Sequence, residues 1–280
     1  WLLETTQGRF ILTMYERRIE TDDLPFFLGL LDHLSAANCP VPRTIHDCDG
    51  AAYRMVDGKA VALIEFLPGL SPSTPTEAQA RSVGAALGQM HQAAQDYPGT
   101  RNSTLEPQDT LEILDQCGTD ALAGIDPALP DILPIGARIV ADWPEHLPGS
   151  IIHSDLFPDN VLMLGDKVTG MIDFYFAATG AMAYDLAVTH AAWCFDDTGE
   201  ACDPALGAAL IAGYESLRPL SDDERAALPL LAQGACLRFI ASRAQDWLET
   251  PEDALVRRKD PMDFMRRLEF YRANGQSAFA

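Results

Sequence analysis

The pattern of hydrophobic positions changes along the chain, from strand-like near the start to helical later on. Two β-rich runs, residues 1–5 and 9–15, flank a Thr-Gln-Gly turn, which is typical of a β-hairpin. Apolar residues at helical spacing predict an amphipathic helix over residues 24–38. Two more strand-like stretches follow, around residues 51–56 and 60–66. The N-terminal part is therefore predicted to be rich in β-structure.

The strand pattern stops at the segment Leu67-Pro68-Gly69, whose Pro and Gly are typical of a connector. A capping box then opens a long helix at Thr76, and a second one opens a helix from Ser221 to about Trp247. Residues 98–134 are broken by Gly and Pro, and their pattern predicts no element. Most of the chain after the connector is expected to be helical.

These patterns predict an α+β protein with two lobes. Residues 1–66 would form a small β-rich lobe that binds nucleotide, and residues 67–280 a larger, mainly helical lobe with the catalytic and substrate-binding residues. Ligand sites often lie where such lobes meet.

The composition narrows the possible partners. A formal charge of −21 repels phosphate backbones and anionic lipids, so we expect neither a nucleic-acid nor a membrane partner. The six cysteines form no CxxC pair, which favours reduced thiols in a cytoplasmic enzyme over disulfides or zinc. No apolar run approaches the roughly 20 residues that span a bilayer. The sequence says nothing about the oligomeric state.

The most informative stretch is residues 151–177, IIHSDLFPDNVLMLGDKVTGMIDFYFA. A short apolar strand leads into a polar loop with His153, Asp155 and Asn160. Two apolar strands joined by a Gly-Asp turn follow, and the second ends at Asp173. Because a hairpin brings its two ends together, we expect Asp173 to stand beside Asn160 although 13 positions separate them.

This set of side chains suits phosphoryl transfer, which needs a group to orient the attacking hydroxyl and cations to neutralise phosphates. Asp155 is predicted to be the base, and Asn160 and Asp173 offer the oxygen ligands that Mg²⁺ prefers. Taken singly, such acids are more often surface charges or helix caps. A metal hydrolase would need a second His at ligand spacing, which is missing near His153.

The chain resembles the aminoglycoside-phosphotransferase-like kinases, a branch of the protein-kinase-like fold. Within them it looks most like the branch that phosphorylates homoserine for threonine biosynthesis. The general resemblance is carried by HSDLFPDN at 153–160, IDF at 172–174, AYDLA at 183–187, IEFLPG at 64–69 and GAALGQMHQA at 84–93. The closer resemblance is carried by RFILTMYERR at 9–18, NCPVP at 38–42, DFYFA at 173–177 and LRFIASRAQDW at 237–247.

The resemblance implies the protein-kinase-like fold, ATP and Mg²⁺ as cofactors, and a role for each residue of the motif. Asp155 would be the catalytic base, Asn160 and Asp173 would bind Mg²⁺ and through it the nucleotide, and His153 would brace the catalytic loop. Asp185 would hold that loop in place, with a plain helix N-cap as an equally good account.

The resemblance also implies how the nucleotide is held. The backbone of Glu65, Phe66 and Leu67 would meet the adenine. Kinases of this fold usually carry a Lys or Arg on the third strand to grip the phosphates, whereas this chain has Thr13 there. Arg17 and Arg18 are near in sequence, but residues at an exposed strand end are more often solvated charges. The phosphate-covering loop would precede Trp1, so the resemblance predicts about one more strand and turn upstream.

The implied substrate, L-homoserine, carries an ammonium and a carboxylate besides its hydroxyl. Arg243, Asp246 and Trp247 lie on one predicted helix and could line the substrate end of the cleft, with Arg243 pairing the carboxylate. An ordinary ion pair on a helix surface explains Arg243 and Asp246 equally well. Arg238 stands on the same helix, near position 242.

Two groups of alternatives stay open. The acidic composition also suits cationic substrates, so an aminoglycoside, choline or methylthioribose kinase is possible on sequence grounds. Thr13 and the missing phosphate loop suggest a non-catalytic nucleotide-binding relative. The intact set of Asp155, Asn160 and Asp173 argues against the second alternative, because a protein without chemistry has no need of all three.

Overall fold

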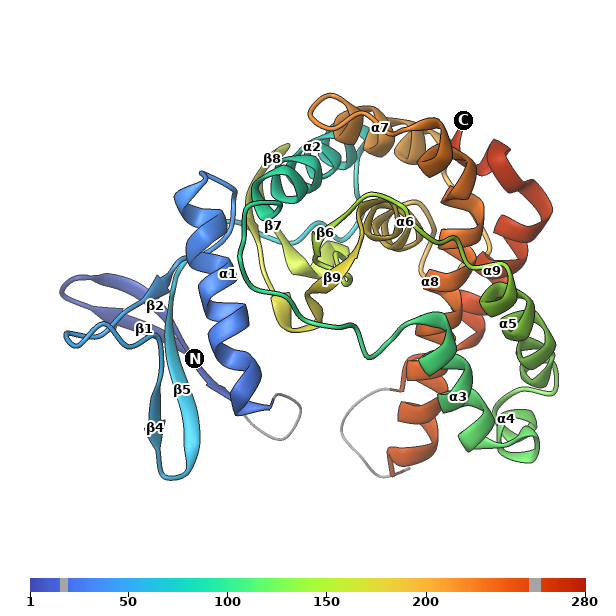
Figure 1. Cartoon of the computed structure of the whole chain (residues 1–280), viewed down its shortest axis with the longest axis horizontal. Coiled ribbons are helices and arrows are strands. Elements are labelled where there is room, and N and C mark those ends of the chain that lie inside the picture. The colour runs from blue at the N-terminus through green and yellow to red at the C-terminus, as the bar shows by residue number, and fades with distance from the viewer. Residues whose placement is uncertain (16–19, 252–257) are drawn as a thin grey trace.

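The computed structural model describes residues 1–15, 20–251 and 258–280. A small antiparallel sheet and one helix lie at the N-terminal end, and a larger, mainly helical part follows (Figure 1). The N-terminal elements are β1 (Leu2–Thr5), β2 (Gly8–Tyr15), η1 (Thr21–Asp23), α1 (Leu24–Ala36), β3 (Thr44–Ile45), β4 (Arg54–Val56) and β5 (Lys59–Glu65).

The N-terminal sheet is built around β5. Its order is β1-β2-β5-β3, with β4 also pairing with β5, and every pairing is antiparallel. Along β5 the side chains of Ala60, Ala62 and Ile64 are buried and their neighbours are more exposed, as expected for a strand with one face on a core. They share a small apolar cluster with Leu24 and Leu28 of α1. The predicted hairpin and the amphipathic helix are both confirmed.

Two strand boundaries differ from the prediction. β4 begins at Arg54, after a turn in which the carboxylate of Asp47 accepts the backbone N–H of Ala51. A side-chain hydrogen bond of this kind competes with the ladder next to a strand. β5 ends at Glu65, which still pairs with Phe10 of β2.

The larger part contains the remaining elements. They are α2 (Glu77–Ala94), α3 (Pro107–Cys117), α4 (Thr119–Ile125), η2 (Leu129–Asp131), α5 (Ile132–Ala141), β6 (Gly149–Ile152), η3 (Pro158–Asn160), β7 (Val161–Leu164), β8 (Lys167–Met171), η4 (Phe174–Phe176), β9 (Ala178–Ala181), α6 (Met182–Trp193), α7 (Pro204–Glu215), α8 (Asp222–Glu249), α9 (Met262–Asn274) and η5 (Gly275–Phe279). Strand β6 pairs with β9, and β7 pairs with β8.

Glycines set the close packing of α2 against α7, which lie together at the top of Figure 1. A Cβ on Gly84 would overlap the carbonyl oxygen of Leu210, and a Cβ on Gly213 would overlap that of Arg81. Each helix therefore places a glycine where the backbone of the other comes closest. This contact gives a structural reason for the glycines in the GAALGQMHQA segment.

Residues 98–134, which predicted no element, contain short helices. Gly118 has a φ of 82°, a left-handed conformation that suits glycine and separates α3 from α4. Buried side chains such as Leu114 of α3 and Leu122 of α4 belong to the main core, and both helices contact α8. Tertiary packing stabilises these segments, since helices this short are marginal by themselves.

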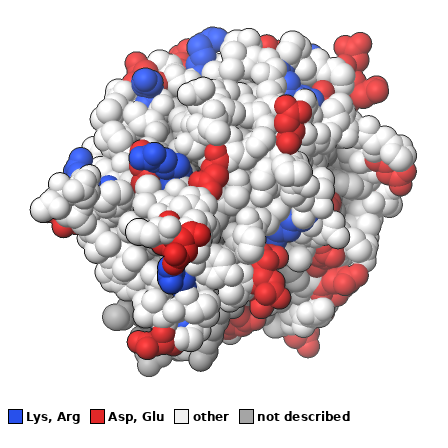
Figure 2. Space-filling view, turned by 60° about the vertical axis from the view of Figure 1, so that its left-hand side comes forward, with Lys and Arg blue, Asp and Glu red and all other residues white. Residues whose placement is uncertain are grey.

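The α+β architecture of a small β-rich lobe followed by a larger helical one is confirmed. No helix in the described part of the chain is long and apolar enough to cross a membrane. Acidic side chains are spread over the face shown in Figure 2, with Lys and Arg side chains among them, so no basic patch dominates that face.

Candidate active site

The loop between β6 and β7 carries the predicted catalytic residues. Strand β6 ends at Ile152, and η3 begins at Pro158. Between them Ser154 adopts a φ of 68°, in the left-handed region that side chains other than glycine rarely occupy. Its N–H donates to Oδ1 of Asp185 at 2.6 Å, and that of His153 donates to Oδ2 at 2.6 Å. These two hydrogen bonds to Asp185 thus fix the backbone of the loop.

Asp155 lies in this loop with its carboxylate largely buried. Nδ2 of Asn160 donates to the Asp155 carbonyl oxygen at 2.8 Å and to Oδ2 at 3.3 Å. Nη2 of Arg238 lies 3.5 Å from Oδ1. Burial raises the pKa of Asp155, against the opposing charge of Arg238. A raised pKa makes the ionised carboxylate a stronger proton acceptor, which suits a base.

The β7–β8 hairpin brings Asp173 to the same place, as its sequence pattern predicts. The N–H of Ile172 donates to the carbonyl of Asn160 at 3.0 Å, and Asp173 follows with a φ of 65°. Burial raises the pKa of Asp173, and the negative charge of Asp155 raises it further. Two carboxylates that disfavour each other's ionisation are a setting in which a cation is stabilising.

The donors at this point fit a hard cation such as Mg²⁺. Asn160 uses its amide N–H group on Asp155, so its Oδ1 is the side-chain oxygen that it can offer to a cation. Such a cation takes oxygen ligands and completes its shell with water and phosphate. Within residues 1–15, 20–251 and 258–280, no group of three or more His, Cys, Asp or Glu side chains could hold a metal ion.

His153 is fully buried, and both of its ring nitrogens are engaged. Nε2 lies 2.9 Å from the carbonyl oxygen of Ile172, and Nδ1 accepts the N–H of Asp155 at 3.2 Å. Because a carbonyl only accepts hydrogen bonds, Nε2 carries the proton. His153 therefore connects the loop to the end of β8 beside Asp173. This geometry fits a bracing residue.

Asp185 lies within α6, in its first turn. The N-cap of α6 is Ala181, so the N-cap account of Asp185 is wrong. Its buried carboxylate instead accepts the N–H groups of His153 and Ser154. The loop-holding account is the one that the structure supports.

An apolar cavity of about 410 Å³ opens beside these residues. Its walls come from α1, from β2 and β5 and from β7, and Asp173 is one of its lining residues. Glu65, Phe66 and Leu67, predicted to meet the adenine, all line it. Its volume and apolar lining are typical of a small-molecule or cofactor site.

The cavity also contains Thr13, at the position where a cation would be usual. Its side chain bonds the hydroxyl of Tyr175, which lies 3.3 Å from that of Tyr15. Arg17 and Arg18, the other basic residues considered for the phosphates, lie outside the described residues.

The three residues predicted to bind substrate, Arg243, Asp246 and Trp247, all lie on α8. Nη1 of Arg243 lies 3.1 Å from Oδ2 of Asp263, and the guanidinium stacks 4.6 Å from the Phe264 ring. The half-buried Trp247 stacks with Arg258, 5.5 Å from its ring. Asp246 is exposed on the same helix. Their substrate role stays a prediction.

Arg238 also lies at the site, although the sequence predicted no role for it. It lies in the apolar run ACLRFIA of α8, and its side chain is only 3% exposed. A charged residue inside an otherwise apolar helical segment is a signal that could have pointed to it, because a buried charge needs partners.

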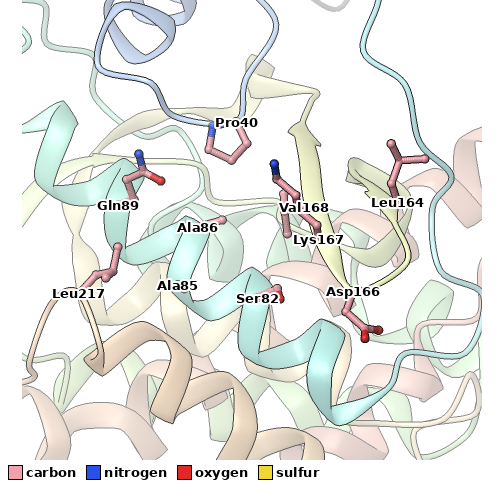
Figure 3. A pocket seen from close by; sticks show the side chains of 10 residues that line it. All are labelled: Pro40, Ser82, Ala85, Ala86, Gln89, Leu164, Asp166, Lys167, Val168 and Leu217. Carbon is pink, nitrogen blue, oxygen red and sulfur yellow. The ribbon is translucent and has the colours of Figure 1, made fainter.

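A second hollow, of about 560 Å³, lies away from these residues (Figure 3). Its floor is α2 with Ser82 and Gln89, and the β7–β8 turn forms a side with Asp166 and Lys167. None of the residues predicted for catalysis or nucleotide binding lines it. The candidate active site is therefore the apolar cavity and the loop beside it.

The phosphotransferase enzyme family model matches residues 1–220. The homoserine kinase of Granulibacter bethesdensis is 45% identical, over 97% of this chain and 85% of its own length. That of Gluconacetobacter diazotrophicus is 46% identical, over 98% of this chain and 85% of its own.

Solved structures share the fold at low identity. An amicoumacin kinase in complex with AMP-PNP, Ca²⁺ and amicoumacin has a TM-score of 0.72 and 16% identity, over 99% of this chain and 84% of its own. A spectinomycin phosphotransferase in complex with ADP and spectinomycin has a TM-score of 0.71 and 15% identity, over 98% and 88%. Together with the sequence matches, these two structures show that the chain has the fold of these phosphotransferases. The chain belongs to the phosphotransferase enzyme family and groups with its homoserine kinases.

Proposed function

We propose that this protein is an ATP-dependent kinase that phosphorylates the side-chain hydroxyl of L-homoserine. The observation that carries the proposal is the placement of Asp155, Asn160 and Asp173 together beside the apolar cavity. The sequence identity of 43–46% to several homoserine kinases, over nearly the whole chain, supports this alcohol as the acceptor.

In the proposed reaction the alcohol oxygen forms a bond to the γ-phosphorus of ATP. The bond from that phosphorus to the β–γ bridging oxygen breaks, and ADP leaves with the electron pair. The carboxylate of Asp155 orients the hydroxyl and takes its proton. The products are O-phosphohomoserine and ADP.

The nucleotide would lie with its base in the apolar cavity, against the backbone of Glu65, Phe66 and Leu67. Its phosphates would then point toward Asp173. Mg²⁺, held by Asn160 and Asp173, would neutralise their charge. Burial of Asp173 and its closeness to Asp155 support a cation at this point, since both raise the pKa of that carboxyl when it is alone.

Arg243, Asp246 and Trp247 are proposed for the amino-acid end of the substrate. Arg243 is held by Asp263 at present, so it would have to share its guanidinium between that carboxylate and the substrate. A guanidinium has five N–H donors and can do so.

The experiment that tests the function is an ADP-release assay with L-homoserine, serine, threonine, choline and an aminoglycoside as acceptors. We expect kcat/KM for homoserine to exceed that for each other alcohol by at least about 100-fold. Phosphorus NMR should identify the product as O-phosphohomoserine. A preference for choline or the aminoglycoside would overturn the substrate assignment. ATP binding without turnover of any alcohol would overturn the assignment of kinase activity.

A further inference from the structure

Arg238 is a buried cation whose place in the site calls for an explanation. Its side chain is 3% exposed, and burying a guanidinium is costly unless its N–H groups find acceptors. Nη1 donates to the carbonyl oxygen of Ser154 and, at 3.0 Å, to its Oγ. The guanidinium also stacks on Phe239, 4.7 Å from the ring centre, and on Phe176 at 5.1 Å. Its hydrogen-bond acceptors on Ser154 thus lie in the catalytic loop.

Those contacts hold Ser154 in an unfavourable conformation. With a φ of 68°, Ser154 occupies the left-handed region, which residues other than glycine rarely adopt, so its surroundings must stabilise it there. Asp185 takes its N–H group, and Arg238 takes both its carbonyl and its hydroxyl oxygen. The next residue is Asp155, so the direction of the catalytic carboxylate depends on this conformation.

The Asp155 carboxylate is held on both sides. Nη2 of Arg238 lies 3.5 Å from Oδ1, a distance that gives mainly electrostatic attraction, and Nδ2 of Asn160 donates to Oδ2 at 3.3 Å. These contacts leave lone pairs on both oxygens for a substrate hydroxyl.

We propose that Arg238 is a positioning residue for the base, because it holds Ser154 in its left-handed conformation and keeps the Asp155 carboxylate aimed at the alcohol. This inference rests on the proposed function in taking Asp155 as the base. Arginine suits the task because its planar fork reaches the Ser154 oxygens and the carboxylate at once, whereas lysine presents a single point charge.

The test compares Arg238→Met and Arg238→Lys with the wild-type enzyme in kcat, substrate KM and melting temperature. For Arg238→Met we expect kcat to fall by about 10²–10³-fold with KM changed by less than about threefold, since a small misplacement of the base costs this much. Arg238→Lys should restore part of kcat, because it returns the positive charge without the planar fork.

Arg267→Met is the matched control. Arg267 is another buried arginine, donating to the carbonyl of Ala191 at 2.8 Å and lying 4.4 Å from the Phe264 ring. Its loss should lower the melting temperature while kcat and substrate KM stay unchanged. An unchanged kcat in both Arg238 variants would overturn the inference, as would a rise in substrate KM alone, which would make Arg238 a substrate ligand. If Arg238→Met does not fold, kcat and substrate KM of Arg238→Lys decide.

The two proposals can fail separately. If the wild-type enzyme prefers another alcohol over homoserine, the substrate assignment fails. The Arg238 comparison is then made with that alcohol and keeps its meaning.

Discussion

Nε2 of His91 lies 2.9 Å from Oδ2 of Asp185, and both side chains are completely buried. The other ring nitrogen of His91 lies 2.8 Å from the hydroxyl of Tyr214, which in turn accepts from Arg218 at 3.2 Å. Asp185 also accepts two backbone N–H groups of the catalytic loop. A continuous chain of buried hydrogen bonds therefore joins the loop to α2 and α7, far from it in sequence.

Asp185→Asn should destabilise the fold strongly. The new amide places an N–H₂ group near donors that need an acceptor, among them the ring of His91 and the backbone N–H of Ser154. A buried donor left without its acceptor typically costs about 1–3 kcal/mol, which urea unfolding would measure. Asp96→Asn, an exposed change at the end of α2, should cost less than about 0.5 kcal/mol. Equal stability of the two variants would contradict this role of Asp185.

The same carboxylate predicts a pH effect. Burial raises the pKa of Asp185, but the hydrogen bonds and charge of His91 outweigh it, so the net pKa lies below the ordinary value of 3.8. Ionised Asp185 therefore stabilises the fold above pH 3.8, and this contribution is lost as the pH falls through the lowered pKa. Wild-type stability should drop below pH 4 more steeply than that of Asp185→Asn, as unfolding curves at several pH values would show.

Asp155→Asn should separate activity from stability. Turnover should fall by about 10²–10⁴-fold because the base is lost, while ATP still binds. Burial raises the pKa of Asp155, so its ionisation opposes folding, and this cost appears as the pH rises through the raised pKa. The variant should thus gain thermal stability relative to wild type between pH 4 and pH 7. Wild-type turnover in the variant would remove Asp155 from its role.

Asp173→Asn should weaken the binding of the metal-bound nucleotide. Removing its charge leaves Asn160 without an anionic co-ligand, so the KM for Mg-ATP should rise by roughly 10–100-fold. A magnesium titration at fixed ATP would measure this, and EDTA should abolish wild-type turnover. Asp166→Asn, an exposed change in the turn of the same hairpin, is the control and should leave the titration unchanged. Identical curves for the two variants would argue against a metal at Asp173.

Arg101 should link the two parts of the molecule. Its Nε donates to Asp23 at 2.8 Å, next to α1, and its Nη1 donates to the carbonyl of Ala177 at 3.2 Å. Arg101→Ala should loosen α1, three of whose side chains line the apolar cavity. A double-mutant cycle with Asp23→Ala should give a coupling of about 0.5–1 kcal/mol for this partly exposed pair.

Hydrogen exchange should show the same loosening of α1. Its amides should exchange faster in Arg101→Ala, and the KM for ATP should rise. Arg138→Ala, an exposed change on α5, should leave both unchanged. Unchanged exchange in α1 would mean that Arg101 does not restrain this helix.

The sequence alone was enough to predict that Asp155, Asn160 and Asp173 lie close together, because their cluster is built locally. The three residues lie within 18 positions of one another, and one hairpin decides their proximity. That hairpin can be predicted, since two apolar runs flank a Gly-Asp turn. The capping boxes at Thr76 and Ser221 marked the starts of α2 and α8 for the same reason, since each depends on residues three positions apart.

Only the tertiary structure showed what holds that cluster in place. Arg238 meets Asp155 across 83 positions, and His91 meets Asp185 across 94. The helices of residues 98–134 likewise owe their stability to packing on α8. No local rule predicts these contacts, because a buried charge has no preferred sequence distance to its partner. It takes whichever partner the packing of helices and strands brings within reach, and that packing depends on the whole chain.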